Sequence, residues 1–113
     1  MTFKNLLDMG LIDSNPILEA KASIGQGDLI NAIVTLTKAI ALNPDYSDAY
    51  LLRSQTLLRM GDRKSAREDM EKLITAYPQN EDVLMLQARI EHAEGKGDEA
   101  IETYTQVIAL NPF

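Results

Sequence analysis

The chain has 113 residues, of which 45% are hydrophobic and 25% are charged, and its formal net charge is −6. These values predict a single folded domain, and an acidic chain without a basic stripe is unsuited to binding nucleic acid or an anionic membrane. The chain contains no cysteine, which excludes disulfide bonds, thiolate metal sites and cysteine nucleophiles.

The sequence carries no recognisable signal for membrane insertion or export. No apolar run approaches the roughly 18 residues that span a bilayer, and residues 1–10 lack the apolar core of a signal peptide. We therefore expect a cytoplasmic protein, although a processed secreted or periplasmic chain would have the same appearance.

Residues 1–12 precede the regular part of the sequence. Phe3, Leu6 and Leu7 follow helical spacing within this segment. Two interpretations stay open: the segment is the remnant of an earlier helix that caps the domain, or it is an arm that docks in a groove of the same domain.

A period of 34 residues organises the rest of the chain. A fixed period of 20–50 residues is typical of repeat proteins, in which each unit buries its apolar face against its neighbours. We therefore divide residues 13–113 into three frames: 13–46, 47–80 and 81–113. Three residue types recur with this spacing: Pro44, Pro78 and Pro112; Ala32, Ala66 and Ala100; Gly27, Gly61 and Gly95.

Each frame predicts two helices joined by a tight turn. Glycine marks the turn, and proline ends the second helix because the residue before proline is pushed out of the α region. Pro16 suits the first turn of a helix, where its missing N–H is not needed. We predict an all-α fold without strands, with helices near residues 15–26, 29–42, 48–60, 63–76, 82–94 and 98–110.

We call the residues at the same position of the three frames a column. The columns of this chain resemble those of the tetratricopeptide repeat family. The resemblance implies a right-handed superhelical α-solenoid of three helix-turn-helix repeats, whose first helices line a concave groove. It covers residues 13–113 and rests on the following matches: Gly27-Asp28, Ala32, Ala39 and Pro44; Tyr50, Ser54, Leu57, Gly61-Asp62, Ala66 and Pro78; Ala88, Gly95, Ala100, Tyr104 and Pro112.

The resemblance further implies that the groove binds a protein or peptide, so that the chain acts as an adaptor. An apolar strip rimmed by basic side chains would suit an apolar or acidic partner segment, either an amphipathic helix or an extended peptide. The column of Leu18, Leu52 and Leu86 either faces this groove or packs between helices. The predicted groove residues are Ile17, Lys21, Leu51, Gln55, Arg59, Met85, Arg89 and His92.

One known ligand of the family is not expected here. Some tetratricopeptide repeat domains grip the C-terminal carboxylate of a chaperone with a clamp of Lys, Asn and Arg. The clamp is absent from this chain, and Asp82 would repel a carboxylate. The corresponding positions hold Ile17, Lys21, Leu52, Asp82 and Leu86.

The C-terminal end of the sequence predicts a second kind of contact. The last predicted helix has an apolar face with no following helix in this chain to cover it. Either the 113 residues belong to a longer array, or the face pairs with another copy, and the alternative function is then a structural unit that homodimerises. The candidate residues are Ile101, Val107, Ile108, Leu110 and Phe113.

We expect no catalytic site, no metal site and no cofactor. His92 is the only histidine, and its acidic neighbours Glu91 and Glu94 are interpreted as surface residues rather than metal ligands. Ser54 and Ser65 have no histidine at helical spacing to activate them. The Gly-x-Gly pairs are interpreted as turns, because a dinucleotide-binding loop needs a preceding strand and a third glycine.

Overall fold

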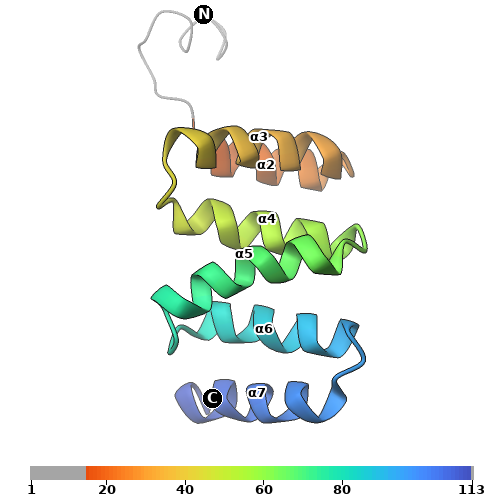
Figure 1. The fold of residues 1–113 in the computed structure, drawn as a ribbon. Coiled ribbons are helices and arrows are strands. Elements are labelled where there is room, and N and C mark those ends of the chain that lie inside the picture. Colours follow the sequence, from red (N-terminus) through yellow and green to blue (C-terminus); the bar gives the residue numbers. More distant parts are fainter. Residues whose placement is uncertain (1–14, 113) are drawn as a thin grey trace, which may run out of the picture.

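The structure is a computed structural model that describes residues 15–112, so the predictions for residues 1–12 and Phe113 lie outside it. Within this range the chain forms six α-helices and no strand, which confirms the all-α solenoid (Figure 1). The predicted helices agree with the observed ones to within one residue at each end. The helices are α2 (Pro16–Gly25), α3 (Leu29–Leu42), α4 (Ser47–Arg59), α5 (Arg63–Ala76), α6 (Glu81–Ala93) and α7 (Gly97–Leu110).

The same turn joins the two helices of every repeat, and the turn between α4 and α5 shows its geometry. Gly61 has φ of 86°, in the left-handed region that glycine adopts without strain. The amide of Asp62 donates to the carbonyl of Leu57 at 2.9 Å, and the amide of Gly61 donates to the carbonyl of Leu58 at 3.0 Å. This pair of bonds closes the helix end in a Schellman motif. Gly27 and Gly95 repeat it, with φ of 79° and 80°.

The stack curves with its first helices on the inner side. Helix α4 contacts both α2 and α6, whereas among the described helices no Cα of α3, α5 or α7 comes within 8 Å of another of these three. In Figure 1, α3 lies in front of α2, and α5 lies in front of α4 and α6. Helices α2, α4 and α6 therefore form the concave face.

Small residues let the two helices of each repeat approach closely. Ala66 is fully buried, as the sequence predicts, and the Ser54 hydroxyl opposite it donates to the Ala66 carbonyl at 2.7 Å. Leu36 and Met70 fill the space beside the small residues of the first two repeats. The small residues at the two repeated positions are at most 2% exposed: Ala20, Ser54 and Ala88; Ala32, Ala66 and Ala100.

A second set of residues on the first helices packs against the preceding repeat. On α6, Leu86 is 1% exposed because it belongs to the same hydrophobic cluster as Met70 and Leu73 of α5. Its counterpart Leu18 on α2 is 62% exposed, and no described helix precedes α2. The column of Leu18, Leu52 and Leu86 therefore packs between helices where a preceding repeat is present.

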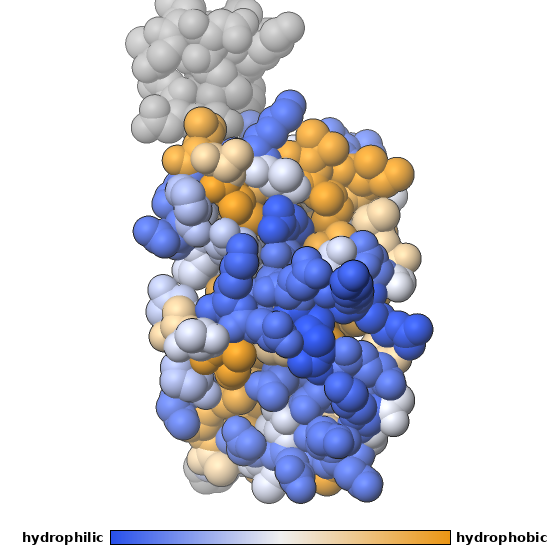
Figure 2. All heavy atoms as spheres, viewed as in Figure 1, coloured by the Kyte–Doolittle hydropathy of each residue, from blue (hydrophilic) through white to orange (hydrophobic). Residues whose placement is uncertain are grey.

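The outer surface changes character along the stack. Figure 2 shows hydrophilic side chains over α5 and hydrophobic ones gathered at the end formed by α2 and α3. On α3 the exposed apolar residues are Ile30, Val34 and Leu42.

Candidate functional site

The candidate site is the concave face, and α6 shows most plainly how the sequence forms it. Asp82, Met85, Arg89 and His92 are placed by their spacing of three and four residues on one stripe of the helix. Met85 is 37% exposed on this stripe. Most of the remaining residues of α6 are buried against α5 and α7. The stripe therefore points away from both neighbouring second helices, into the inner curve of the stack.

The other two first helices present the same stripe with fewer exposed residues. Lys21 on α2 and Arg59 on α4 are exposed, whereas Ile17, Leu51 and Gln55 are half-buried. The side chains of Ile17 and Leu51 each pack against the hydrophobic core on one side. The predicted groove residues thus lie on the first helices, and their role in binding stays a prediction.

A hollow opens where α4 and α6 begin. Its apolar lining comes from Leu51, Leu73 and Val83, and Asp48 and Asp82 belong to the same lining. Sequence analysis missed Leu73 and the other contributors from outside the first helices, because it considered only the columns of those helices. The remaining lining residues are Ser47, Tyr77 and Asn80.

The concave face carries five charged residues that form no ion pair within residues 15–112. None of the five forms an ion pair with any other residue in the range 15–112, and the ion pairs of this range lie elsewhere on α4, α5 and the turn after α6. Charge is therefore available to a partner on this face. The five residues are Lys21, Asp48, Arg59, Asp82 and Arg89.

Arg53 and Asp69 form a structural ion pair inside the second repeat. The guanidinium donates to both carboxylate oxygens, from Nε at 2.8 Å and from Nη2 at 2.7 Å, and Asp69 is 4% exposed. This hydrogen-bonded carboxylate raises the pKa of Arg53. A third bond from Arg53 reaches the Thr37 hydroxyl on α3 at 3.3 Å. The pair holds α4 to α5.

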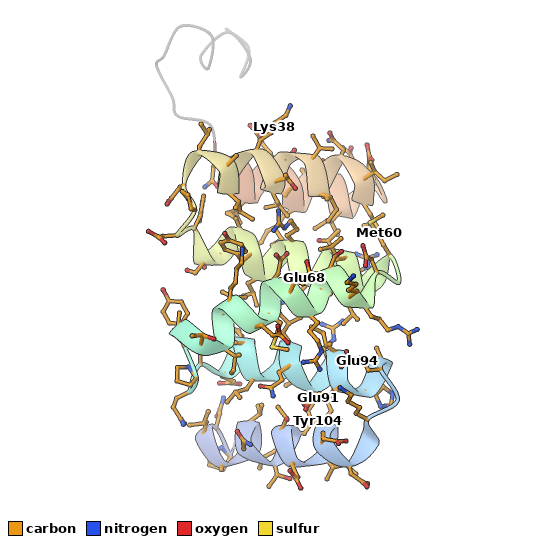
Figure 3. The ribbon with its side chains drawn as sticks, viewed as in Figure 1. Lys38, Met60, Glu68, Glu91, Glu94 and Tyr104 are labelled. Atoms are coloured by element: carbon orange, nitrogen blue, oxygen red, sulfur yellow. The ribbon has the colours of Figure 1, made fainter. Side chains whose placement is uncertain are left out.

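Arg67 and Glu94 form a second ion pair, which crosses from α5 to the end of α6. Arg67 donates from Nε to Glu94 at 2.7 Å and makes a second bond from Nη2, and it also approaches Glu71 at 3.5 Å. The hydrogen bond from Arg67 lowers the pKa of Glu94, and Glu94 raises the pKa of Arg67. Figure 3 shows Glu94 at the turn that follows α6. The pair fastens the third repeat to the second.

The structure corrects one residue of the predicted oligomer face. Val107 is 6% exposed, because it lies on the side of α7 that packs against α6, the one helix among residues 15–112 that contacts α7. Ile101 and Ile108 are 65% and 63% exposed, and Leu110 is 45% exposed. The exposed strip on α7 therefore consists of Ile101, Ile108 and Leu110.

Neither a candidate metal site nor a membrane-spanning helix is found among residues 15–112. Residues 15–112 contain no group of three or more His, Cys, Asp or Glu side chains placed to hold a metal ion. No helix in the described part of the chain is long and apolar enough to cross a membrane.

Comparison with known proteins places this geometry among tetratricopeptide repeats. Sequence profiles of that family match residues 23–90 and 81–113. Tetratricopeptide repeat protein 36 of Xenopus tropicalis is 31% identical, in a match that covers 76% of this chain and 50% of that protein. The crystal structure of a thermophilic TPR protein of Thermus thermophilus superposes with a TM-score of 0.75 at 19% identity, covering 87% of this chain and 56% of that one. The chain thus spans about half the length of these relatives.

Proposed function

Because the chain belongs to the tetratricopeptide repeat family, we propose that it holds a segment of a partner protein on the concave face of α2, α4 and α6. Repeats of this family are generally protein-interaction modules, and proteins built from them are typically non-enzymatic scaffolds. The proposal rests above all on the stripe that includes Asp82, Met85 and Arg89, which is accessible on α6 although the rest of that helix is mostly buried.

The chemistry of the face supports a partner that is apolar in part. Met85 is 37% exposed, and Leu51 and Ile17 leave one side of each side chain accessible. An apolar side chain of a partner would remove this surface from water at about 25 cal/mol per Å². The neighbouring free charges of Lys21 and Arg89 would then add selectivity rather than most of the affinity.

A displayed peptide library, selected on the immobilised chain, tests the proposal. Selected peptides should lose most of their binding to Met85→Asp, because an apolar side chain of the peptide would have to desolvate the new carboxylate. Met85 is a better site for this change than Leu51, which also packs against the core.

The chain offers a matched control for this experiment. Ile30→Asp/Val34→Asp makes the same chemical change on α3, where both residues are exposed on the outer surface. This variant should bind the selected peptides as the wild type does. Peptides that lose binding to the α3 variant and keep binding to Met85→Asp would place the interaction on the outer surface and refute the proposal.

Self-association through α7 is a second candidate function, and one observation favours it. Ile40 and Ile74 are partly buried by the next repeat, whereas Ile108 at the same repeat position is 63% exposed. Sedimentation of the chain should then detect a dimer that Ile101→Lys/Ile108→Lys dissociates. A monomeric wild type at about 100 µM, a concentration high enough to reveal a dimer of modest affinity, would exclude this function.

A further inference from the structure

We infer that the groove selects an amphipathic helix whose two flanks carry opposite charge, and this inference rests on the proposed function. The first helices are parallel, because each begins at the same edge of the stack in Figure 1. Asp48 lies in the first turn of α4 and Asp82 in the first turn of α6. Basic residues lie further along these helices, at Arg59 on α4 and Arg89 on α6. One edge of the groove is therefore acidic and the other is basic.

The apolar strip runs between these two edges. On α6, Met85 lies three residues after Asp82 and four residues before Arg89. On α4, Leu51 lies three residues after Asp48 and belongs to the lining of the hollow between α4 and α6. A partner that covers Leu51 and Met85 thus meets carboxylates on one side and guanidinium groups on the other.

The width between the edges fits a helix better than an extended strand. At a rise of about 1.5 Å per residue, Asp82 and Arg89 are separated by about 10 Å along α6, and Asp48 and Arg59 by about 16 Å along α4. A helix with side chains is about 10–12 Å in diameter and can place an apolar stripe between two charged flanks, whereas a strand directs its alternate side chains to only two opposite sides. A helix laid across the first helices therefore reaches both edges at once.

Charge availability also favours this partner. Asp48, Asp82, Arg59 and Arg89 form no ion pair with the rest of residues 15–112, so a partner does not have to displace an internal ion pair. The complementary helix carries Lys or Arg on the flank that faces the starts of α4 and α6, and Asp or Glu on the opposite flank. If such a helix were rotated by 180° in the plane of the groove, its apolar side would still face the groove. Each charged flank would then lie against the edge that carries the same charge. The two edges therefore also fix the direction in which the helix lies.

Two synthetic helical peptides of about 14 residues, long enough to cross three first helices packed about 8–10 Å apart, test the inference. They have the same composition and the same apolar stripe. In the first peptide, Lys occupies one flank and Glu the other, and in the second peptide both charges alternate on both flanks. At low ionic strength the first peptide should bind about tenfold more tightly by fluorescence anisotropy, and added salt should remove the difference.

A charge-exchanged variant provides the second measurement. Asp48→Arg/Asp82→Arg/Arg59→Asp/Arg89→Asp exchanges the two edges and keeps the net charge. It should still prefer the first peptide but bind it in the reverse direction. A paramagnetic label on the N-terminus of the peptide should then broaden NMR signals at the opposite end of the stack from those broadened in the wild type.

The outcomes separate this inference from the proposed function. Equal binding of the two peptides, abolished in both cases by Met85→Asp, would overturn the inference while supporting a binding groove. An unchanged direction in the charge-exchanged variant would overturn it as well. Absence of binding by both peptides would also overturn it, and the library selection would then decide on the proposed function by itself.

Discussion

The two junctions between repeats join corresponding helices but differ in the residues that fill them. At the first junction α4 packs on α3, and the surrounding cluster is built mostly from small residues such as Ala39 and Ala49. At the second junction α6 packs on α5, and larger residues fill the cluster, with Leu86 1% exposed and Ile90 fully buried. The ion pair of Arg67 with Glu94 also crosses the second junction.

The repeat register therefore determines where a residue lies but not how much stability it provides. In a stacked repeat protein, stability is approximately the sum of the repeats and of the junctions between neighbours. The larger apolar contacts at the second junction should couple the second and third repeats tightly. The first repeat should therefore open before the other two.

Truncating the leucine at the same position of each junction should give the largest difference. Leu86→Ala should lower the free energy of unfolding by about 2–5 kcal/mol, because it leaves a cavity in a filled cluster. Leu52→Ala should have a smaller effect, of about 1–2 kcal/mol, because Leu52 is only half-buried. Urea denaturation of the two variants measures both values. Equal losses would mean that the two junctions contribute equally and would remove the basis of the contrast.

Acid should weaken the second junction selectively. The pKa of Glu94 is lowered in the folded protein, so its contribution is complete above the unfolded pKa and disappears as the pH falls through the folded value. Glu94→Gln should lose about 1 kcal/mol near neutral pH, and this difference from the wild type should vanish at acidic pH. Urea denaturation across a pH series measures it.

Glu71 supplies the matched control for the acid effect. It also approaches Arg67, but within α5 and at 3.5 Å, so it does not cross the junction. Glu71→Gln should change the stability by only about 0.2–0.5 kcal/mol. A pH-independent loss in Glu94→Gln would show that the ion pair does not contribute to the junction.

The smallest effect should come from a helix cap in the third repeat. Asp28 and Asp62 accept hydrogen bonds from the amides of Asn31 and Ser65, whereas Lys96 occupies the same position without a side-chain cap. Lys96→Asn should supply the cap and stabilise the protein by about 0.5–1 kcal/mol.

Hydrogen exchange can show how far this gain spreads. If the second junction couples its repeats tightly, amides of α4 to α7 should become more protected in Lys96→Asn, and those of α2 and α3 should change less. An equal gain in all six described helices would contradict the expected weakness of the first junction.

Much of the fold could be predicted from the sequence, because proline ends a helix, glycine forms a turn and alanine allows two helices to pack closely. Helix ends, turns and the buried position of Ala66 follow from single residues and their spacing. Which contacts form between repeats depends on neighbours that the period does not describe. The prediction for Val107 was wrong because the period gives a position on the helix but not the helix that it faces.

The candidate site was only partly predictable. The columns of the first helices predicted Met85 and Arg89 as groove residues, and both are exposed in the structure, whereas their role in binding stays a prediction. The hollow beside the acidic edge depends on Leu73 and Tyr77, which reach it from α5 and the connection after it. No single column of the repeat joins these residues, so only the folded chain brings them together.

The turn at Gly61 has a consequence that concerns chirality. A Cβ atom added there would meet no atom within 4 Å, so the turn has room for a side chain. With φ of 86°, the backbone disfavours an L-residue by its handedness alone. A D-alanine, whose preferred φ has the opposite sign, fits this backbone and has fewer unfolded conformations than glycine. At this turn glycine thus serves as the genetically encoded substitute for a mirror-image residue.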